Sequence, residues 1–185
     1  MGDIIQLKIT LKDTEPAIWR EILVDKSTTF STLHVIIQIV MGWDSSHLYE
    51  FNINGSRVGE PHQDDQMWGL KMEDASLKSL GSLISRSKLK FSYLYDFGDS
   101  WEHVIQVEKI LPKEENVKYP VCIDGALNCP PDDCGGVGGF YDLLNILKNK
   151  KHPEYKEMLE WMGGKYDPEA FNKGLVNRLL QKISK

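Results

Sequence analysis

The chain has 185 residues, of which 41% are hydrophobic and 26% charged, which predicts one globular domain over residues 1–185. Its formal net charge of −5 argues against generic duplex nucleic-acid binding, because such binding depends on clustered Lys and Arg. No long apolar run and no signal-peptide pattern occurs, so we expect neither a membrane span nor secretion. Three cysteines are an odd number, which predicts a reducing, cytoplasmic location without a disulfide framework.

The first third of the chain predicts a hairpin followed by a helix. Apolar residues alternate with polar ones from Ile5 to Leu11, and a second strand is predicted over residues 17–24. The turn residues 13–16 between them indicate an antiparallel pair. A helix is then expected between Thr29, as the N-cap, and Gly42, where the helix ends.

A third strand is predicted from Tyr49 to Ile53, because apolar residues alternate up to the turn dipeptide Asn54-Gly55. The order hairpin, helix, strand resembles the opening of a β-grasp fold. Residues 60–69 are polar and predict a loop. Asp74 is expected to cap a short helix that extends to Ile84.

A second hairpin is predicted from alternating residues on both sides of a tight turn. Phe91 to Phe97 share one strand face, and Trp101 to Val107 share one face of the next strand. Residues 98–100 form the turn between them. From residue 112 to 139 the chain is rich in Pro, Gly and Asp and predicts a long ordered loop.

The last third predicts three helices. The first is centred on residues 143–147, the second ends at Gly163-Gly164, and the third is expected to open at Asp167-Pro168. The predicted fold class is therefore α+β. A β-grasp-like opening is extended by the second hairpin into a mixed sheet, and the C-terminal helices are expected to cover it.

The turn of the second hairpin carries polar residues that could form a site. Two carboxylates (Asp96 and Asp99), an indole (Trp101) and an imidazole (His103) surround it. The alternative is that the acids bond turn amides while Trp101 and His103 pack in the core. The sequence leaves both interpretations open.

Three thiols and three carboxylates within thirteen residues could bind a divalent metal, where thiolates would favour zinc and carboxylates would favour magnesium, calcium or manganese. Cys122, Cys129 and Cys134 lie within thirteen residues, and His103 could supply a fourth ligand, which would favour zinc. Their spacing is not the C-x-x-C spacing of structural zinc sites. The alternative is that the cysteines are buried as small apolar side chains.

A glycine run before the first C-terminal helix could bind an anion through backbone amides at the helix start. The run consists of Gly135, Gly136, Gly138 and Gly139. It lacks the lysine of a phosphate-binding loop, and Asp132 and Asp133 would repel a phosphate that arrived without a cation. A metal ion between these acids would reverse that objection.

Several segments together resemble the plasmid pRi ORF-3-like family. They are residues 16–20, 33–43, 47–51, 93–103, 129–136 and 139–141. The resemblance covers nearly the whole chain and implies an α+β domain of bacteria and archaea, often with a mobile-element or resolvase-like label. It implies no established activity and carries over no catalytic residues. The family tends to have Glu-Asp where this chain has Asp132-Asp133, a change that preserves charge.

These observations favour a non-enzymatic ligand-binding or interaction module with one polar cleft. Its predicted ligand-binding residues are His47, Asp96, Asp99, Trp101, His103, Asp132 and Asp133. Two alternatives stay open: a metal-dependent phosphoester hydrolase, and a mobile-element accessory protein. A divalent metal is the candidate cofactor, and a small ligand or protein partner is favoured over nucleic acid or membrane.

Overall fold

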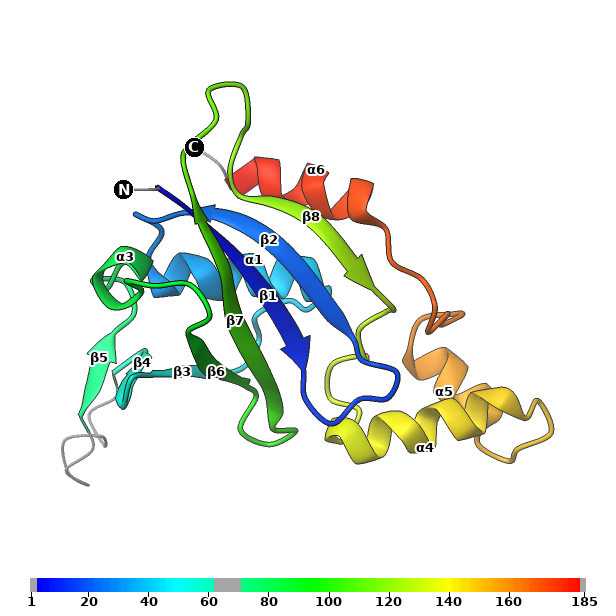
Figure 1. The fold of residues 1–185 in the computed structure, drawn as a ribbon. Helices are drawn as coiled ribbons and strands as arrows, with labels where there is room; N and C mark the ends of the chain where they lie inside the picture. Colours follow the sequence, from blue (N-terminus) through cyan, green and yellow to red (C-terminus); the bar gives the residue numbers. More distant parts are fainter. Residues whose placement is uncertain (1–2, 62–70, 184–185) are drawn as a thin grey trace.

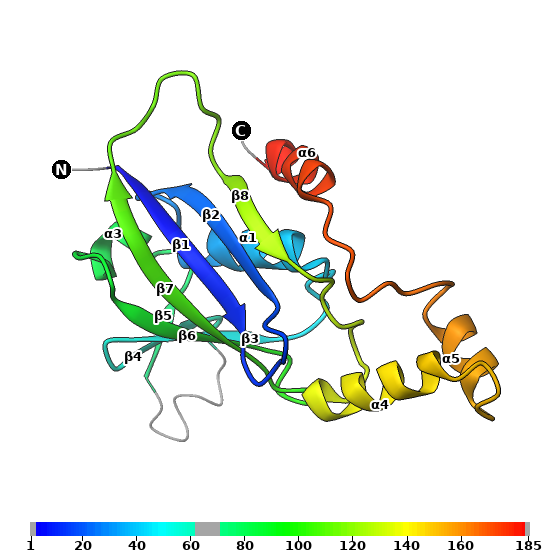
Figure 2. The ribbon, with the colours of Figure 1, turned by 45° about the vertical axis from the view of Figure 1, so that its right-hand side comes forward.

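A computed structural model describes residues 3–61 and 71–183 (Figures 1 and 2). These residues form one mixed sheet of eight strands in the order β5-β4-β3-β6-β7-β1-β2-β8, in which only β4 and β5 pair in parallel. The strands are β1 (Ile4–Leu11), β2 (Trp19–Asp25), β3 (Tyr49–Ile53), β4 (Ser56–Gly59), β5 (Met72–Asp74), β6 (Lys90–Tyr95), β7 (Trp101–Leu111) and β8 (Val121–Ala126).

Helices account for most of the remaining regular structure. They are α1 (Phe30–Met41), α3 (Leu80–Leu83), α4 (Gly136–Lys148), α5 (Tyr155–Trp161) and α6 (Lys173–Ile183). None of the helices in the described ranges is long and apolar enough to cross a membrane. The loop predicted for residues 60–69 lies outside the described residues except for its first two positions.

The predicted hairpin and helix are confirmed, and so are the residues predicted to begin and end the helix. β1 and β2 pair antiparallel, and the buried side chains of β1 alternate along the strand. Thr29 caps α1, because its side-chain oxygen accepts the backbone N–H of Thr32 at 3.1 Å. Gly42 ends the helix at a φ of 98°, a left-handed conformation that favours glycine.

The α+β class is confirmed, but the β-grasp comparison is not. Hairpin, helix and strand follow one another in the chain as expected. However, β3 pairs with β4 and β6, and two strands, β6 and β7, separate it from the opening hairpin. The predicted second hairpin, β6 and β7, therefore forms the centre of the sheet and does not extend its edge.

Three strands were not predicted. β4 and β5 are short, and β8 lies inside the stretch from residue 112 to 139 that the sequence indicates as irregular. β8 forms because it pairs antiparallel with β2, a contact between distant parts of the chain. The longest irregular stretch is therefore broken by an edge strand.

Several predicted element ends were wrong. Asp74 caps a turn by accepting the Ser76 amide at 2.8 Å, and α3 begins only at Leu80. β6 ends at Tyr95, before Phe97, because Asp96 has a φ of +55° that a strand cannot continue. The Asp167 side chain likewise caps a local turn through the Glu169 amide, and α6 begins six residues later.

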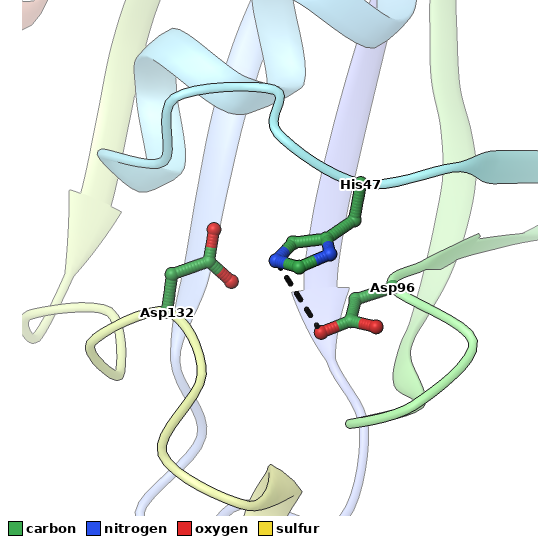
Figure 3. A group of neighbouring side chains, drawn as sticks. All are labelled: His47, Asp96 and Asp132. Atoms are coloured by element: carbon green, nitrogen blue, oxygen red, sulfur yellow. Dashed lines mark ion pairs between the residues drawn. The ribbon is translucent and has the colours of Figure 1, made fainter.

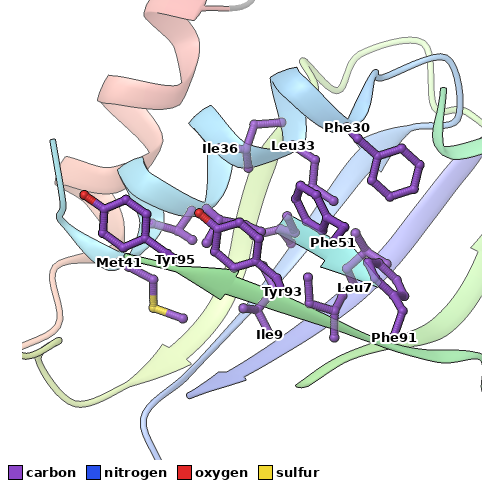
Figure 4. Close-up of a cluster of buried hydrophobic side chains, with 14 of the residues drawn as sticks. Leu7, Ile9, Phe30, Leu33, Ile36, Met41, Phe51, Phe91, Tyr93 and Tyr95 are labelled. Atoms are coloured by element: carbon purple, nitrogen blue, oxygen red, sulfur yellow. The ribbon is translucent and has the colours of Figure 1, made fainter. Parts of the chain in front are cut away.

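The main core lies between α1 and one face of the sheet (Figure 4). Leu33 and Ile36 of α1 pack with strand residues such as Leu7, Phe51 and Tyr93, all of them buried. The cover of this face therefore comes from α1. Of the C-terminal helices, α6 contacts β8 and α1, whereas α4 and α5 pack together beyond the end of the sheet (Figure 2). The predicted cover by C-terminal helices is thus only partial.

One buried cation, Arg20 of β2, holds the chain after β8 in place. Its guanidinium donates to the carbonyls of Val40 at 2.7 Å, Ala126 at 2.8 Å and Leu127 at 2.8 Å. It also lies 4.2 Å from the centre of the Phe171 ring. These bonds connect the end of α1 to the segment that leads into residues 129–134.

Candidate functional site

Two segments far apart in the sequence meet at the turn between β6 and β7. The side chain of Asp99 accepts the Gly135 amide at 3.0 Å, and the Tyr95 hydroxyl donates to Asp132 Oδ2 at 2.9 Å. A β-carbon on Gly136 would lie 2.4 Å from the Asp99 carbonyl oxygen, so the close approach requires glycine there. The structure therefore brings the acidic hairpin turn against the loop that precedes α4.

A histidine and three aspartates gather at this meeting point, and Figure 3 shows His47, Asp96 and Asp132 among them. We call His47, Asp96, Asp132 and Asp133 the histidine–aspartate cluster. Ligand atoms of the first three lie within 4.8 Å of one another. His47 Nε2 is 3.8 Å from Asp96 Oδ2 and 3.1 Å from Asp133 Oδ1. The imidazole thus lies among three carboxylates.

Three different connecting segments supply the residues of the cluster. His47 lies in the connection between α1 and β3, Asp96 directly follows β6, and the two other acids precede α4. Asp96 adopts positive φ, which Asp tolerates better than most residues, and accepts the Gly98 amide at 2.8 Å. The turn therefore directs the Asp96 side chain toward His47.

Some polar atoms of the cluster are buried without a hydrogen bond. Among the described residues, His47 Nε2 and Asp132 Oδ1 have no hydrogen-bond partner, although Nε2 makes its ion contact with Asp133. Burial raises the pKa of Asp132 above its usual value, while the hydrogen bond from Tyr95 opposes this shift. Such unsatisfied atoms are rare in folded proteins and require an explanation.

The cluster carries little compensating positive charge. Within residues 3–61 and 71–183, His47 is the only basic side chain that forms an ion pair with Asp96 or Asp133, and none forms one with Asp132. Asp133 is the exposed member, with 68% of its side chain accessible, whereas the Asp96 side chain is only 10% exposed. The cluster is thus an acidic site that is open to solvent on one side.

Trp101 and His103 are placed differently from their predicted role in the cleft. Both are fully buried on the core face of β7, where Trp43 lies between 5 and 6 Å from each ring. His103 Nδ1 contacts the Trp101 carbonyl at 3.0 Å, and burial lowers the pKa of His103 to about 4. The structure therefore places these two side chains in the core packing behind the cluster.

The thiols and His103 are not brought together. The metal-ligating group found in the described residues contains no cysteine. Cys122 lies on β8, Cys129 is buried and Cys134 is partly buried, and burial raises the pKa of each thiol, to about 11 for Cys122 and about 12 for Cys134. The thiols therefore stay protonated at neutral pH, as is typical of structural cysteines.

The glycine run serves close packing at the start of α4. The Gly135 amide already binds the Asp99 carboxylate, which also suits the positive end of the helix dipole. Gly139 donates to the Gly135 carbonyl at 3.1 Å, and a β-carbon on Gly139 would overlap the Cys134 carbonyl. Gly138 is unobstructed. The anion at this helix start is thus a side chain of the protein itself.

A family profile described as Plasmid pRiA4b ORF-3-like protein matches residues 3–174. The chain belongs to this family. It is 36% identical to Uncharacterized protein y4hQ of Sinorhizobium fredii, over all of this chain and 94% of that protein. It also resembles the crystal structure of the protein of unknown function MM3350 from Methanosarcina mazei Go1. That match has a TM-score of 0.82 and 34% identity, and it covers 92% of this chain and 96% of the other.

These comparisons agree with the resemblance read from the sequence motifs and indicate no enzymatic or specific role. Both relatives carry descriptions that state only that their functions are unknown.

Tyr95 is the site residue that sequence reasoning missed. It directly precedes Asp96, and the sequence pattern places it only on a strand face. Its hydroxyl reaches Asp132, and its ring stacks on Trp43 with centres 5.1 Å apart. A tyrosine at the last position of a strand, directly before a turn acid, is the signal that could have found it.

A pocket of about 340 Å³ adjoins the cluster. Trp43, Asp44 and Asp132 contribute to its wall on the side of the cluster, and Lys165 and Tyr166 line it as well. Asp132 therefore belongs both to the cluster and to the pocket. The volume is at the lower end of the range that small-molecule sites occupy.

Proposed function

We propose that this pRiA4b ORF-3-like protein is a non-enzymatic binding module that takes a cationic ligand at the histidine–aspartate cluster. The observation that carries the proposal is the convergence of three carboxylates on one imidazole, with no lysine or arginine of the described residues paired to them. Like charges at such short distances repel one another. A bound cation would offset this repulsion.

The surroundings of the cluster also support a binding role. Leu48 and Phe97 directly follow His47 and Asp96, and both are about half exposed although they are large and apolar. The Asp96 amide donates to the Leu48 carbonyl at 3.0 Å, so the backbone segments that carry Leu48 and Phe97 are hydrogen-bonded to each other beside the cluster. A ligand that carries an apolar group next to its cation would find matching contacts here.

The test is a titration with cations of different chemistry. Spermidine and the chlorides of magnesium, calcium, manganese, cobalt and zinc are added separately to the protein, and the melting temperature and the NMR shift of the Gly98 amide are followed. At roughly a hundredfold excess over the dissociation constant, we expect at least one cation to raise the melting temperature by about 5 to 10 °C. The Gly98 amide should shift because it binds Asp96.

The double variant Asp96→Asn/Asp132→Asn should lose both responses. Glu115→Gln is the matched control, because Glu115 is exposed in the segment after β7, at the end opposite to the cluster. If none of the cations shifts Gly98 or the melting temperature, the proposed function is wrong.

We also propose that the protein works in the cytoplasm. Its three cysteines are free, as expected where thiols are kept reduced. A fusion to a fluorescent protein, imaged in the host cell, tests this location directly.

A further inference from the structure

We propose that the cation is a divalent first-row transition metal, bound by His47 Nε2 and by carboxylate oxygens of Asp96 and Asp132. This inference rests on the proposed function and gives its ligand a chemical identity. It differs from the metal site predicted from the sequence, which used the three cysteines and His103.

The distances between the ligand atoms suit one ion. Two ligands that are each about 2.1 Å from a metal lie roughly 3.0 to 4.2 Å apart, depending on geometry. His47 Nε2 and Asp96 Oδ2 are 3.8 Å apart, and all three ligand atoms lie within 4.8 Å of one another. Closure onto an ion therefore requires movements of only about half an ångström.

The two carboxylates are oriented by groups behind them. One oxygen of Asp96 accepts the Gly98 amide at 2.8 Å, and its other oxygen faces His47. One oxygen of Asp132 accepts the Tyr95 hydroxyl at 2.9 Å, and its other oxygen is buried without a hydrogen bond among the described residues. Metal-binding carboxylates typically have such supporting hydrogen bonds, which leave one oxygen free for the ion.

The donor set favours a transition metal over calcium or magnesium. Calcium and magnesium prefer oxygen ligands alone, whereas an imidazole nitrogen suits zinc, cobalt, nickel and copper. His47 supplies that nitrogen, and its Nε2 atom is buried without a hydrogen bond in the described part of the chain. Asp133 Oδ1, 3.1 Å from this nitrogen, can become a fourth ligand with a small rotation, because its side chain is largely exposed.

Three protein ligands with an exposed fourth leave room for a further group on the metal. The pocket of about 340 Å³ begins at Asp132 and contains Lys165. A small molecule that coordinates the ion could therefore extend into this pocket.

The experiment is a titration of the full-length protein with cobalt(II) chloride, followed by visible absorption and calorimetry. We expect one ion per chain and a d–d spectrum of nitrogen and oxygen ligation, without a thiolate-to-cobalt charge-transfer band. His47→Gln should weaken cobalt binding at least thirtyfold and magnesium binding by less than threefold. Tyr95→Phe, which removes only the supporting hydrogen bond, should weaken cobalt binding about tenfold.

His152→Gln is the matched control, because His152 lies in the connection between α4 and α5, and it should bind cobalt as the unaltered protein does. A strong thiolate band that survives His47→Gln would overturn the inference in favour of the cysteines. Binding of spermidine without any transition metal would overturn it as well, but would leave the proposed function standing. If no cation binds, both are wrong.

Discussion

Arg20 and the histidine–aspartate cluster are two charged regions of the molecule that differ in how many of their polar atoms form hydrogen bonds. Arg20 is only 2% exposed, and its guanidinium donates four hydrogen bonds to backbone carbonyls. In the cluster, by contrast, His47 Nε2 and Asp132 Oδ1 are buried without hydrogen bonds from the described residues. The chain thus supplies acceptors for four of the five N–H donors of Arg20, whereas it supplies no hydrogen-bond partner for these two cluster atoms.

The difference separates a structural role from a binding role. A buried polar group whose hydrogen bonds are complete stabilises one arrangement of the backbone. A group of like charges with incomplete hydrogen bonds costs free energy, and proteins retain such groups mainly at functional sites. Substitutions in the two regions should therefore change stability with opposite signs.

The largest effect is expected at Arg20. The substitution Arg20→Met removes the donor from four backbone carbonyls, one in a buried and three in part-buried hydrogen bonds, and each costs about 1 kcal/mol when left unpaired. We expect the free energy of unfolding to fall by about 3 kcal/mol or more in urea titrations followed by circular dichroism. Arg178→Met on the exposed side of α6 is the control. A loss of less than about 1 kcal/mol would show that the hydrogen bonds of Arg20 do not hold the segment after β8 in place.

The next effect concerns pH and two buried neutral histidines. Burial lowers the pKa of His34 and of His103 to about 4, below the ordinary value of 6.5. The unfolded chain therefore binds more protons than the folded one between these values, so stability is complete above pH 6.5 and falls as the pH drops toward 4.

As the pH falls from above 6.5 to below 4, each of these histidines should lower the free energy of unfolding by about 2 to 3 kcal/mol. His34→Gln keeps a partner for the Tyr93 hydroxyl, which lies 2.7 Å from His34 Nδ1, and removes the titrating group. When the free energy of unfolding from urea titrations is plotted against pH, the slope should be shallower for this variant than for the unaltered protein. Equal slopes would contradict the assignment of the pH dependence to His34.

A smaller effect of opposite sign is expected in the cluster. Asp132→Asn removes one of the three negative charges, while its amide oxygen can still accept from Tyr95. In buffer with a chelator, we expect the free energy of unfolding to rise by up to about 1 kcal/mol. A clear loss of stability in the same measurement would indicate that Asp132 has a structural role.

The smallest effect is expected for Asp99→Asn. Its carboxylate binds the Gly135 amide and is not among the ligand atoms of the cluster. Because asparagine also offers an oxygen acceptor, both stability and cation affinity should stay within about 0.5 kcal/mol of the unaltered protein. A tenfold loss of cation affinity would place Asp99 in the site.

Local signals in the sequence predicted the elements that depend on local interactions. β1, β2 and α1 were predicted correctly because the alternation lies within the strands and the capping residues Thr29 and Gly42 directly flank the helix. β8 was missed because it is stabilised by pairing with β2, which the Pro- and Gly-rich composition around it conceals. Asp167-Pro168 was predicted to begin a helix, but the Asp167 side chain accepts the Glu169 amide in a turn instead. The same side-chain hydrogen bond can form in a turn or at a helix start, so the sequence does not distinguish the two.

The candidate site could be predicted only in part for a related reason. The sequence indicated that His47, Asp96, Asp132 and Asp133 share a cleft, and the structure brings them together. It could not tell these residues from His103, whose imidazole points to the core face of β7 together with Ile105 and Val107. The spacing of cysteines gives no side-chain direction either, so the sequence alone could not exclude the thiol set.

The most direct test of this account is the calorimetric titration of zinc(II) into the chelator-treated protein and into Asp96→Asn/Asp132→Asn. The account predicts one zinc ion per chain for the unaltered protein and at least a hundredfold weaker binding to the double variant. Equal zinc affinity in the two proteins would contradict the claim that the unsatisfied cluster is the binding site.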